Sequence, residues 1–291
     1  MVRDEADIVE AFVRHNLGFL HRLYVVDHRS RDGTREILKA LVAEGLPLSL
    51  ETDEREAHLQ ADTVTSLARR AFAEGATCVI PLDADEFLKI PSRIAFKRWI
   101  ASVPSSCCAL MEWHTYVPDL EVEVHHPLQA ARARRAEEGH GLHKVILTQA
   151  FGGEERAVVG PGNHVVLMQG AHQDLVSAPA TLALAPPEIV ALAHLPIRNV
   201  DQLMRKVRTG WHAHQAANPD DDSLAVHWRE LAKEFETTRP VGDRLRQVVY
   251  NYGIPMKRWM PVDGCNRLID DPLPVTSTLR YRLASRQPES G

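Results

Sequence analysis

The segment Thr77-Cys78-Val79-Ile80-Pro81-Leu82-Asp83-Ala84-Asp85-Glu86 decides the fold prediction. Its apolar first part predicts a buried strand over 77–82 that ends directly in acidic residues. In an extended chain, side chains two residues apart point to the same side, roughly 6–7 Å apart, so Asp83 and Asp85 would lie together. Two such carboxylates repel each other unless a cation neutralises them, and Mg²⁺ or Mn²⁺ binds carboxylates together with phosphate oxygens and water. We therefore expect one of these ions here; the alternative is an acidic loop.

The residues before this segment alternate between helical and strand patterns. In order, they predict a helix over 4–17, a strand over 23–26, a turn at 30–34 leading into a helix that ends at Gly45, a strand over 48–51 and a helix over 60–74. Such alternation indicates βαβ units and a largely parallel sheet, in which ligands bind beyond the carboxyl ends of the strands. Asp27 and Asp83 both end a predicted strand, so we expect them at the same edge of the sheet.

The residues after this segment divide the chain further. Strands are predicted over 109–117, 143–148, 164–168 and 189–193, and helices over 199–215, 223–236 and 242–252. We therefore expect an α/β domain over 1–198, a helical extension over 199–270 and a loosely held tail over 271–291.

The composition is that of an ordinary globular protein, with 44% apolar and 25% charged residues and a formal net charge of −5. A chain without an excess of positive charge is not expected to bind nucleic acid. Four cysteines without a C-x-x-C pair indicate a reducing cytoplasmic setting, and no run of about 18 apolar residues predicts a membrane span. The basic run of Arg132, Arg134 and Arg135 is expected to be solvated; its alternative role is contact with an anionic acceptor or, peripherally, with a membrane surface.

A second polar motif, Asp27-His28-Arg29-Ser30-Arg31-Asp32-Gly33-Thr34, follows the strand predicted over 23–26. A strand-end aspartate can accept hydrogen bonds from a nucleobase N–H group or a ribose hydroxyl, which is the role we expect for Asp27. Asp32 and Thr34 have suitable side chains to cap the following helix, and we expect that role for them.

Several motifs together carry a resemblance to a known family. They are Arg3-Asp4-Glu5-Ala6-Asp7-Ile8-Val9-Glu10, Val25-Val26-Asp27 with the turn that follows it, Leu82-Asp83-Ala84-Asp85-Glu86-Phe87, His143-Lys144-Val145-Ile146, Gly162-Asn163-His164, and His194-Leu195-Pro196-Ile197-Arg198 leading to Gln202, Arg205-Lys206-Val207 and Gly210. In this order and spacing, residues 2–211 resemble the family-2-like glycosyltransferases.

The resemblance implies a GT-A fold, which is a Rossmann-like α/β fold with a mixed, mostly parallel sheet flanked by helices. It implies a UDP-, GDP- or dTDP-sugar as donor and a carbohydrate or glycoconjugate as acceptor. Asp83 and Asp85 would bind the metal and the diphosphate, with His194, or second His164, completing the metal shell. The residues implied for nucleotide-sugar binding are Asp4, Glu5, Asp27, Arg29, Asp83, Arg198 and Lys206. For Lys206, as for Arg205, the alternative is the solvated face of a helix.

The chain departs from the family pattern at its start. Asp4 stands where the family usually has Asn, and the strand that normally precedes this segment is missing or reduced to two residues. We therefore expect the first strand of the domain to be truncated.

The catalytic base is open. An inverting glycosyltransferase needs a carboxylate near the acceptor hydroxyl, and the candidates are Glu112, Asp119 and Asp174. Two other function classes are open as well. One is a protein that binds nucleotide or glycan without turnover, and the other is a sugar nucleotidyltransferase, which would need a glycine-rich phosphate loop that Arg3–Ile8 does not offer.

Overall fold

The computed structural model describes residues 1–56, 59–120, 122, 124–139, 141–170, 175–177, 182–217, 226–262 and 267–281. The α-helices are α1 (Val9–Leu17), α2 (Thr34–Ala43), α3 (Gln60–Ala73), α4 (Arg93–Ser102), α5 (Gln149–Gly152), α6 (Val200–Ala217), α7 (Val226–Phe235) and α8 (Gly242–Asn251). The strands are β1 (Leu23–Asp27), β2 (Leu48–Thr52), β3 (Glu86–Lys89), β4 (Cys108–Thr115), β5 (Ala133–Arg135), β6 (His143–Ile146), β7 (Ala157–Val159), β8 (Val166–Gln169), β9 (Leu175–Ser177), β10 (Leu182–Leu184), β11 (Ala191–His194) and β12 (Leu268–Asp270).

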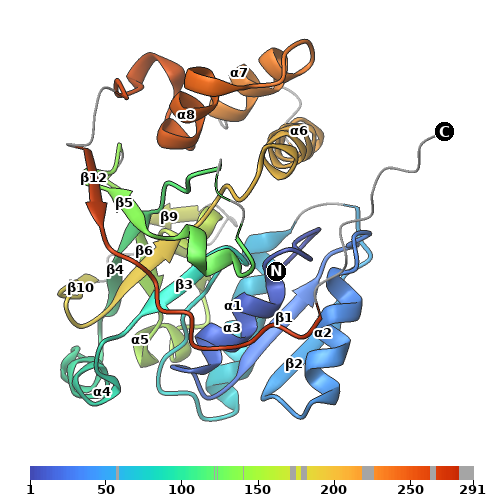
Figure 1. Cartoon of the computed structure of the whole chain (residues 1–291). Helices are drawn as coiled ribbons and strands as arrows, with labels where there is room; N and C mark the ends of the chain where they lie inside the picture. Colours follow the sequence, from blue (N-terminus) through green and yellow to red (C-terminus); the bar gives the residue numbers. More distant parts are fainter. Residues whose placement is uncertain are drawn as a thin grey trace.

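The central sheet is built around β4 (Figure 1). One edge of β4 pairs with β6 in the antiparallel sense, and the other edge pairs in parallel with β10 and β11. β3 runs antiparallel to β11, in a register that places Glu86 opposite His194. The predicted α/β class is therefore confirmed as a mixed sheet flanked by helices.

β1 and β2 form a separate parallel pair, which the opening residues extend by one bridge. Val2 lies beside Asp27, with its N–H donating to Val26 O at 2.8 Å and its carbonyl accepting from the N–H of His28 at 2.8 Å. The prediction of a strand over 77–82 is wrong. Only Val79 pairs there, in an antiparallel bridge with Leu147, and Pro81 has no N–H group with which a ladder could continue.

α1 begins at Val9 and not at residue 4 as predicted. The reason is that the polar turn at 30–34 holds the opening residues outside a helix. The N–H of Asp4 donates to Ser30 Oγ at 3.0 Å, and the N–H of Glu5 donates to Thr34 Oγ1 at 2.8 Å. Val9, Phe12 and Val13 then bury one face of α1 in a core shared with α2 and β1.

α6, α7 and α8 lie together at one end of the sheet, at the top of Figure 1, and have an apolar core of their own. Leu203 and Val207 of α6 are fully buried against Leu231 of α7 and Val248 of α8. The helices predicted over 199–215 and 242–252 match α6 and α8, and the one predicted over 223–236 begins among residues that the structure does not describe.

Residues 271–281, the described part of the tail predicted over 271–291, contact the rest of the chain at several points, although most of their side chains are exposed. Leu273 is buried, and Asp271 forms ion pairs with Lys89 and Arg134. The N–H groups of Arg280 and Tyr281 each donate to the Glu10 carboxylate at 2.8 Å. In Figure 1 this segment runs from β12 across the front of the molecule toward α2, and residues 282–291 lie outside the described part.

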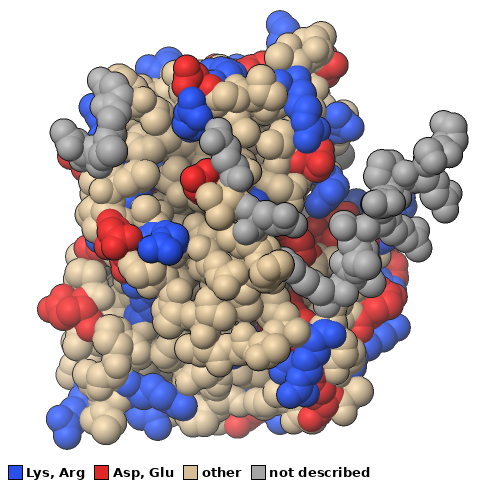
Figure 2. All heavy atoms as spheres, in the orientation of Figure 1, with Lys and Arg blue, Asp and Glu red and all other residues tan. Residues whose placement is uncertain are grey.

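The basic run at 132–135 does not form a solvated patch. Arg135 is 1% exposed, and its guanidinium donates to Tyr252 O at 2.8 Å and lies 3.4 Å from the Glu138 carboxylate. Arg134 lies 2.8 Å from Asp271. On the face shown in Figure 2, basic and acidic side chains are interspersed. No helix in the described part of the chain combines the length and apolar content that crossing a bilayer needs.

Candidate functional site

The acidic segment at 83–86 forms a tight turn that leads into β3. The N–H of Glu86 donates to Asp83 O at 3.1 Å, and the Glu86 carboxylate accepts from the N–H of Asp83 at 2.9 Å. This turn leaves the Asp83 side chain 31% exposed, whereas the Asp85 side chain is 5% exposed. The two aspartates therefore have different surroundings.

Asp83 is held by polar side chains from three elements. Lys144 Nζ lies 2.9 Å from Asp83 Oδ2, and Gln60 Nε2 donates to Asp83 Oδ1 at 2.9 Å. Asn163 Nδ2 lies 3.4 Å from the same Oδ1. Burial alone would raise the pKa of Asp83, but the ammonium of Lys144 outweighs it and the net shift is downward.

Glu86 shares the same ammonium and is completely buried. Its Oε1 lies 2.6 Å from Lys144 Nζ, and the Lys144 side chain is itself 1% exposed. Burial raises the pKa of Glu86 to about 8, although Lys144 acts in the opposite direction. Neither residue was given a role from the sequence. The only available signals were that Lys144 stands in a strand of apolar residues and that its segment belongs to the family resemblance.

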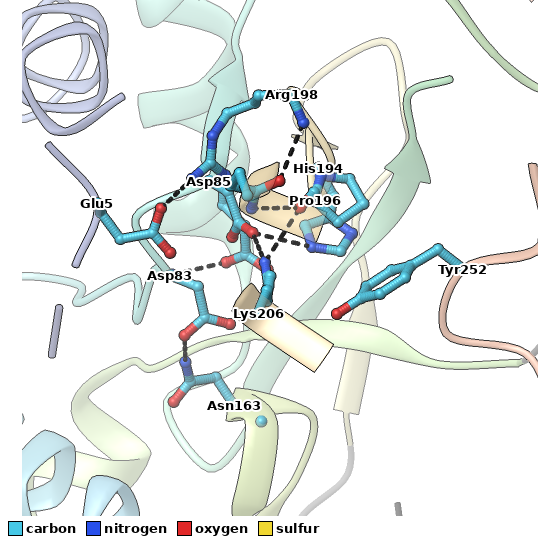
Figure 3. A network of polar contacts seen from close by, with 12 residues as sticks. Glu5, Asp83, Asp85, Asn163, His194, Pro196, Arg198, Lys206 and Tyr252 are labelled. Carbon is cyan, nitrogen blue, oxygen red and sulfur yellow. Dashed lines mark hydrogen bonds and ion pairs between the residues drawn. The ribbon is translucent and has the colours of Figure 1, made fainter. Parts of the chain in front are cut away.

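Asp85 faces α6 and the end of β11 (Figure 3). Its Oδ2 forms an ion pair with Lys206 Nζ and lies 3.7 Å from His194 Nε2. Burial would raise the pKa of Asp85, but Lys206 and His194 reverse the shift and hold the pKa well below its usual range. Burial lowers the pKa of His194, which favours the neutral imidazole at pH 7.

Arg198 connects this site to the opening residues of the chain. Its guanidinium forms ion pairs with Glu5 and with Asp7, the latter at 2.7 Å. Burial raises the pKa of Glu5 to about 7 against the opposing charge of Arg198. Nη1 of Arg198 is buried and has no hydrogen-bond partner among the residues that the structure describes. Glu5, Arg198 and Lys206, three of the predicted nucleotide-sugar residues, therefore come together around Asp85.

Asp27 lies at the end of β1, as predicted, and is completely buried. Its Oδ2 accepts from Arg35 Nε at 2.7 Å, while Oδ1 is buried and finds no hydrogen-bond partner in the described part of the chain. Asp4 and Arg29, the other predicted nucleotide contacts, belong to the neighbouring loops. Asp4 accepts from the N–H of Arg31 at 2.7 Å, and Arg29 lies 3.5 Å from Glu56.

The predicted capping role is only partly met. Asp32 Oδ1 accepts from the N–H of Thr34 at 3.0 Å, but the residue at the N-cap position of α2 is Gly33, with a φ of 95°. The other oxygen of Asp32 accepts from the N–H of Ala6 at 3.0 Å. The main task of this turn is therefore to position the opening residues, including Glu5.

Of the candidate bases, Glu112 is the one whose orientation the described contacts define. The ring of Trp113 packs against His194 and His164, at centroid distances of 4.6 and 5.0 Å. Successive residues of a strand point to opposite faces, so Glu112 points away from this cluster, and it pairs with His114 at 2.8 Å. His164, the second metal candidate, bonds through Nδ1 to His143 O at 2.8 Å. Of the other candidates, Asp119 is exposed beyond the end of β4, and Asp174 lies outside the described residues.

The fit to Mn²⁺ or Mg²⁺ differs between the predicted ligands. Asp85 and His194 offer a carboxylate oxygen and a neutral imidazole nitrogen 3.7 Å apart, and two ligands each about 2.1 Å from one ion lie at most about 4.2 Å apart. Both oxygens of Asp83 are bonded, to Lys144 and to Gln60, and Oδ2 of Asp85 is bonded to Lys206, so an ion would have to displace a cationic side chain at either aspartate. Within the described part of the chain, no group of three or more His, Cys, Asp or Glu side chains is arranged to hold an ion. The residues therefore fit an ion bound by two protein ligands and completed by phosphate oxygens and water.

No protein-family model matches this chain, and no curated protein matches it in sequence.

Proposed function

We propose that this chain is a GT-A glycosyltransferase that transfers a sugar from a nucleoside-diphosphate sugar to a carbohydrate or glycoconjugate acceptor. The observation that supports the proposal most directly is the meeting of Asp85, His194, Arg198 and Lys206 in one place. They combine a carboxylate–imidazole pair with two cationic side chains, which is the chemistry that a metal-bound diphosphate requires. Asp27, with a buried acceptor oxygen that has no partner, is the proposed contact to the nucleoside.

In the reaction, the bond between the anomeric carbon and the diphosphate oxygen breaks, and a bond from that carbon to the acceptor oxygen forms. The acceptor proton leaves to a base, and the diphosphate leaves with the bonding electron pair. A divalent ion held by Asp85 and His194 would neutralise charge on the diphosphate. Lys206 and Arg198 would bind the same leaving group, because ammonium and guanidinium groups form strong hydrogen bonds with phosphate oxygens.

The test is thermal unfolding of the full chain with UDP, GDP and dTDP and with the corresponding sugar donors, each with MnCl₂ and with EDTA. A ligand that binds only the folded state at about 100 times its Kd stabilises the protein by about 2.7 kcal/mol. We expect one nucleotide base to raise the melting temperature more than the other two. If no nucleotide shifts the melting temperature under either condition, the proposal is wrong.

A protein that binds a nucleotide sugar without turnover is the second candidate. One observation favours it: Glu112, one of the base candidates, pairs with His114 and points away from the cluster of Trp113 and His194. Hydrolysis of the stabilising donor sugar, followed by release of nucleoside diphosphate, separates the two candidates. An enzyme releases nucleoside diphosphate slowly without an acceptor, whereas a binding protein does not release it at all.

A further inference from the structure

We infer that Lys206 occupies the position of the divalent cation in the ligand-free site, so that Lys206 and the metal compete for Asp85. The inference deepens the proposed function and rests on it for the identity of the diphosphate. It concerns one carboxylate, which in the structure faces both the predicted metal ligand His194 and the ammonium of Lys206.

The ammonium of Lys206 lies at the Asp85 oxygen that a bound ion would use. Lys206 Nζ bonds to Asp85 Oδ2, the same oxygen that lies 3.7 Å from His194 Nε2. An ion bound between Asp85 and His194 would therefore meet the ammonium at that oxygen. Two cations at one carboxylate oxygen repel each other, so binding of the ion requires Lys206 to leave.

Lys206 is more exposed and pairs with fewer carboxylates than Lys144. The Lys206 side chain is 24% exposed, whereas Lys144 is 1% exposed and is held by both Asp83 and Glu86. Apart from Asp85, Lys206 Nζ lies 3.4 Å from Pro196 O and 5.9 Å from the centre of the Tyr252 ring. The side chain of Lys206 can therefore move toward solvent or toward an incoming anion by breaking one ion pair, whereas Lys144 would have to break two.

Binding of the metal and binding of the diphosphate are coupled through the ion pair between Lys206 and Asp85. A diphosphate that takes up the ammonium of Lys206 releases Asp85 for the metal, and a metal on Asp85 releases Lys206 for the diphosphate. Each ligand therefore increases the affinity for the other, and by linkage the two factors are equal. Each of the two ligands alone should bind weakly, because it has to break the ion pair between Lys206 and Asp85.

Removing the cationic side chain of Lys206 should change the affinities for Mn²⁺ and for the diphosphate in opposite directions. Without Lys206, Asp85 is free for the metal, so Mn²⁺ should bind more tightly in the absence of nucleotide. The diphosphate loses a charged contact and should bind more weakly. A hydrogen bond between charged groups is worth about 1.5–3 kcal/mol, so we expect changes of about 10- to 100-fold.

The experiment measures Mn²⁺ binding to the full chain without nucleotide, by the loss of the electron paramagnetic resonance signal of free Mn²⁺. The variants are Lys206→Met, Lys206→Gln, which keeps a hydrogen-bond donor beside Asp85, and Lys206→Arg, which keeps the charge. Asp85→Asn removes the shared ligand. The matched control is Lys89→Met, because Lys89 is 23% exposed and pairs with Asp271 away from the site. Thermal unfolding establishes which variants are folded, and either neutral variant is sufficient.

We expect the neutral Lys206 variants to bind Mn²⁺ at least about tenfold more tightly than wild type and Lys89→Met, and Asp85→Asn to lose this binding. Equal or weaker Mn²⁺ binding in the folded neutral variants would overturn the inference. So would the absence of Mn²⁺ binding from every variant. The nucleotide measurements decide the proposed function separately, because a nucleotide that stabilises the protein supports that function whatever Mn²⁺ does.

Discussion

Lys144 Nζ lies 2.6 Å from Glu86 Oε1, and both side chains are almost completely excluded from water. The same ammonium lies 2.9 Å from Asp83. Removing Lys144 leaves the Asp83 carboxylate without its cation and the buried, protonated Glu86 without its partner, and leaving buried polar groups unsatisfied costs about 1–3 kcal/mol. We therefore expect Lys144→Met to lower the free energy of unfolding by about this amount, measured by urea denaturation. The matched control is Arg156→Met, which removes the exposed pair between Arg156 and Glu154 and should cost less than about 1 kcal/mol.

The pH dependence of stability should show the titration of Glu86. Its pKa is raised from 4.5 in the unfolded chain to about 8 in the folded protein. Between these values the folded state binds more protons than the unfolded state, so this contribution to stability is complete below pH 4.5 and is lost as the pH rises through 8. We expect the free energy of unfolding of wild type, relative to that of Glu86→Gln, to fall over this range. A constant difference from pH 5 to pH 9 would contradict the buried, protonated state of Glu86.

Arg198 is expected to matter for stability as well as for binding. Arg198→Met leaves the partly buried carboxylate of Glu5 and the exposed carboxylate of Asp7 without their cation, and we expect a loss of about 1–3 kcal/mol in urea denaturation. Arg239→Met is the control, because its pair with Asp201 is exposed and should contribute less than about 1 kcal/mol. Similar losses in the two variants would show that Arg198 does not hold the opening residues in place.

Asp27 is expected to bind the nucleoside and not the diphosphate. Asp27→Asn keeps the shape of the side chain but replaces one acceptor oxygen with a donor, so we expect the stabilising nucleotide to bind at least about tenfold more weakly. Glu54→Gln is the matched control, because Glu54 also pairs with Arg35, at 2.9 Å, but is exposed. Calorimetric titration with the nucleotide measures both variants. Nucleotide affinities that do not differ between the two would remove Asp27 from the proposed site.

Much of the architecture could be predicted because it depends on local periodicity. The apolar faces of α2, α3 and α6 repeat at spacings of three and four, and β1 ends at Asp27 as its pattern predicts. The apolar run at 77–82 misled the prediction because hydrophobicity does not reveal a pairing partner. Val79 finds only Leu147, and Pro81 cannot donate a hydrogen bond to a neighbouring strand.

The site could be predicted in its residue types but not in its pairings. The sequence singled out Asp83, Asp85, His194 and Lys206 as candidates, but it could not show that Lys144 pairs with one aspartate and Lys206 with the other. These partners are separated by 61 and 121 residues, and only the folded sheet brings them together. The same limit applies to the tail predicted over 271–291, because local sequence does not show that Glu10 accepts hydrogen bonds from the N–H groups of Arg280 and Tyr281.

The bonds from the N–H groups of Arg280 and Tyr281 to Glu10 have a consequence for synthesis of the chain. They connect residues that are separated by 270 and 271 positions in the sequence. Leu273 belongs to the same apolar core as the buried face of α1. During translation, α1 emerges from the ribosome long before residues 271–281. The Glu10 carboxylate and this apolar surface therefore remain uncovered until that segment has been synthesised. Until then the nascent protein offers a hydrophobic surface of the kind that chaperones bind. A chain that is terminated before residue 271 would therefore be expected to aggregate more than the full chain.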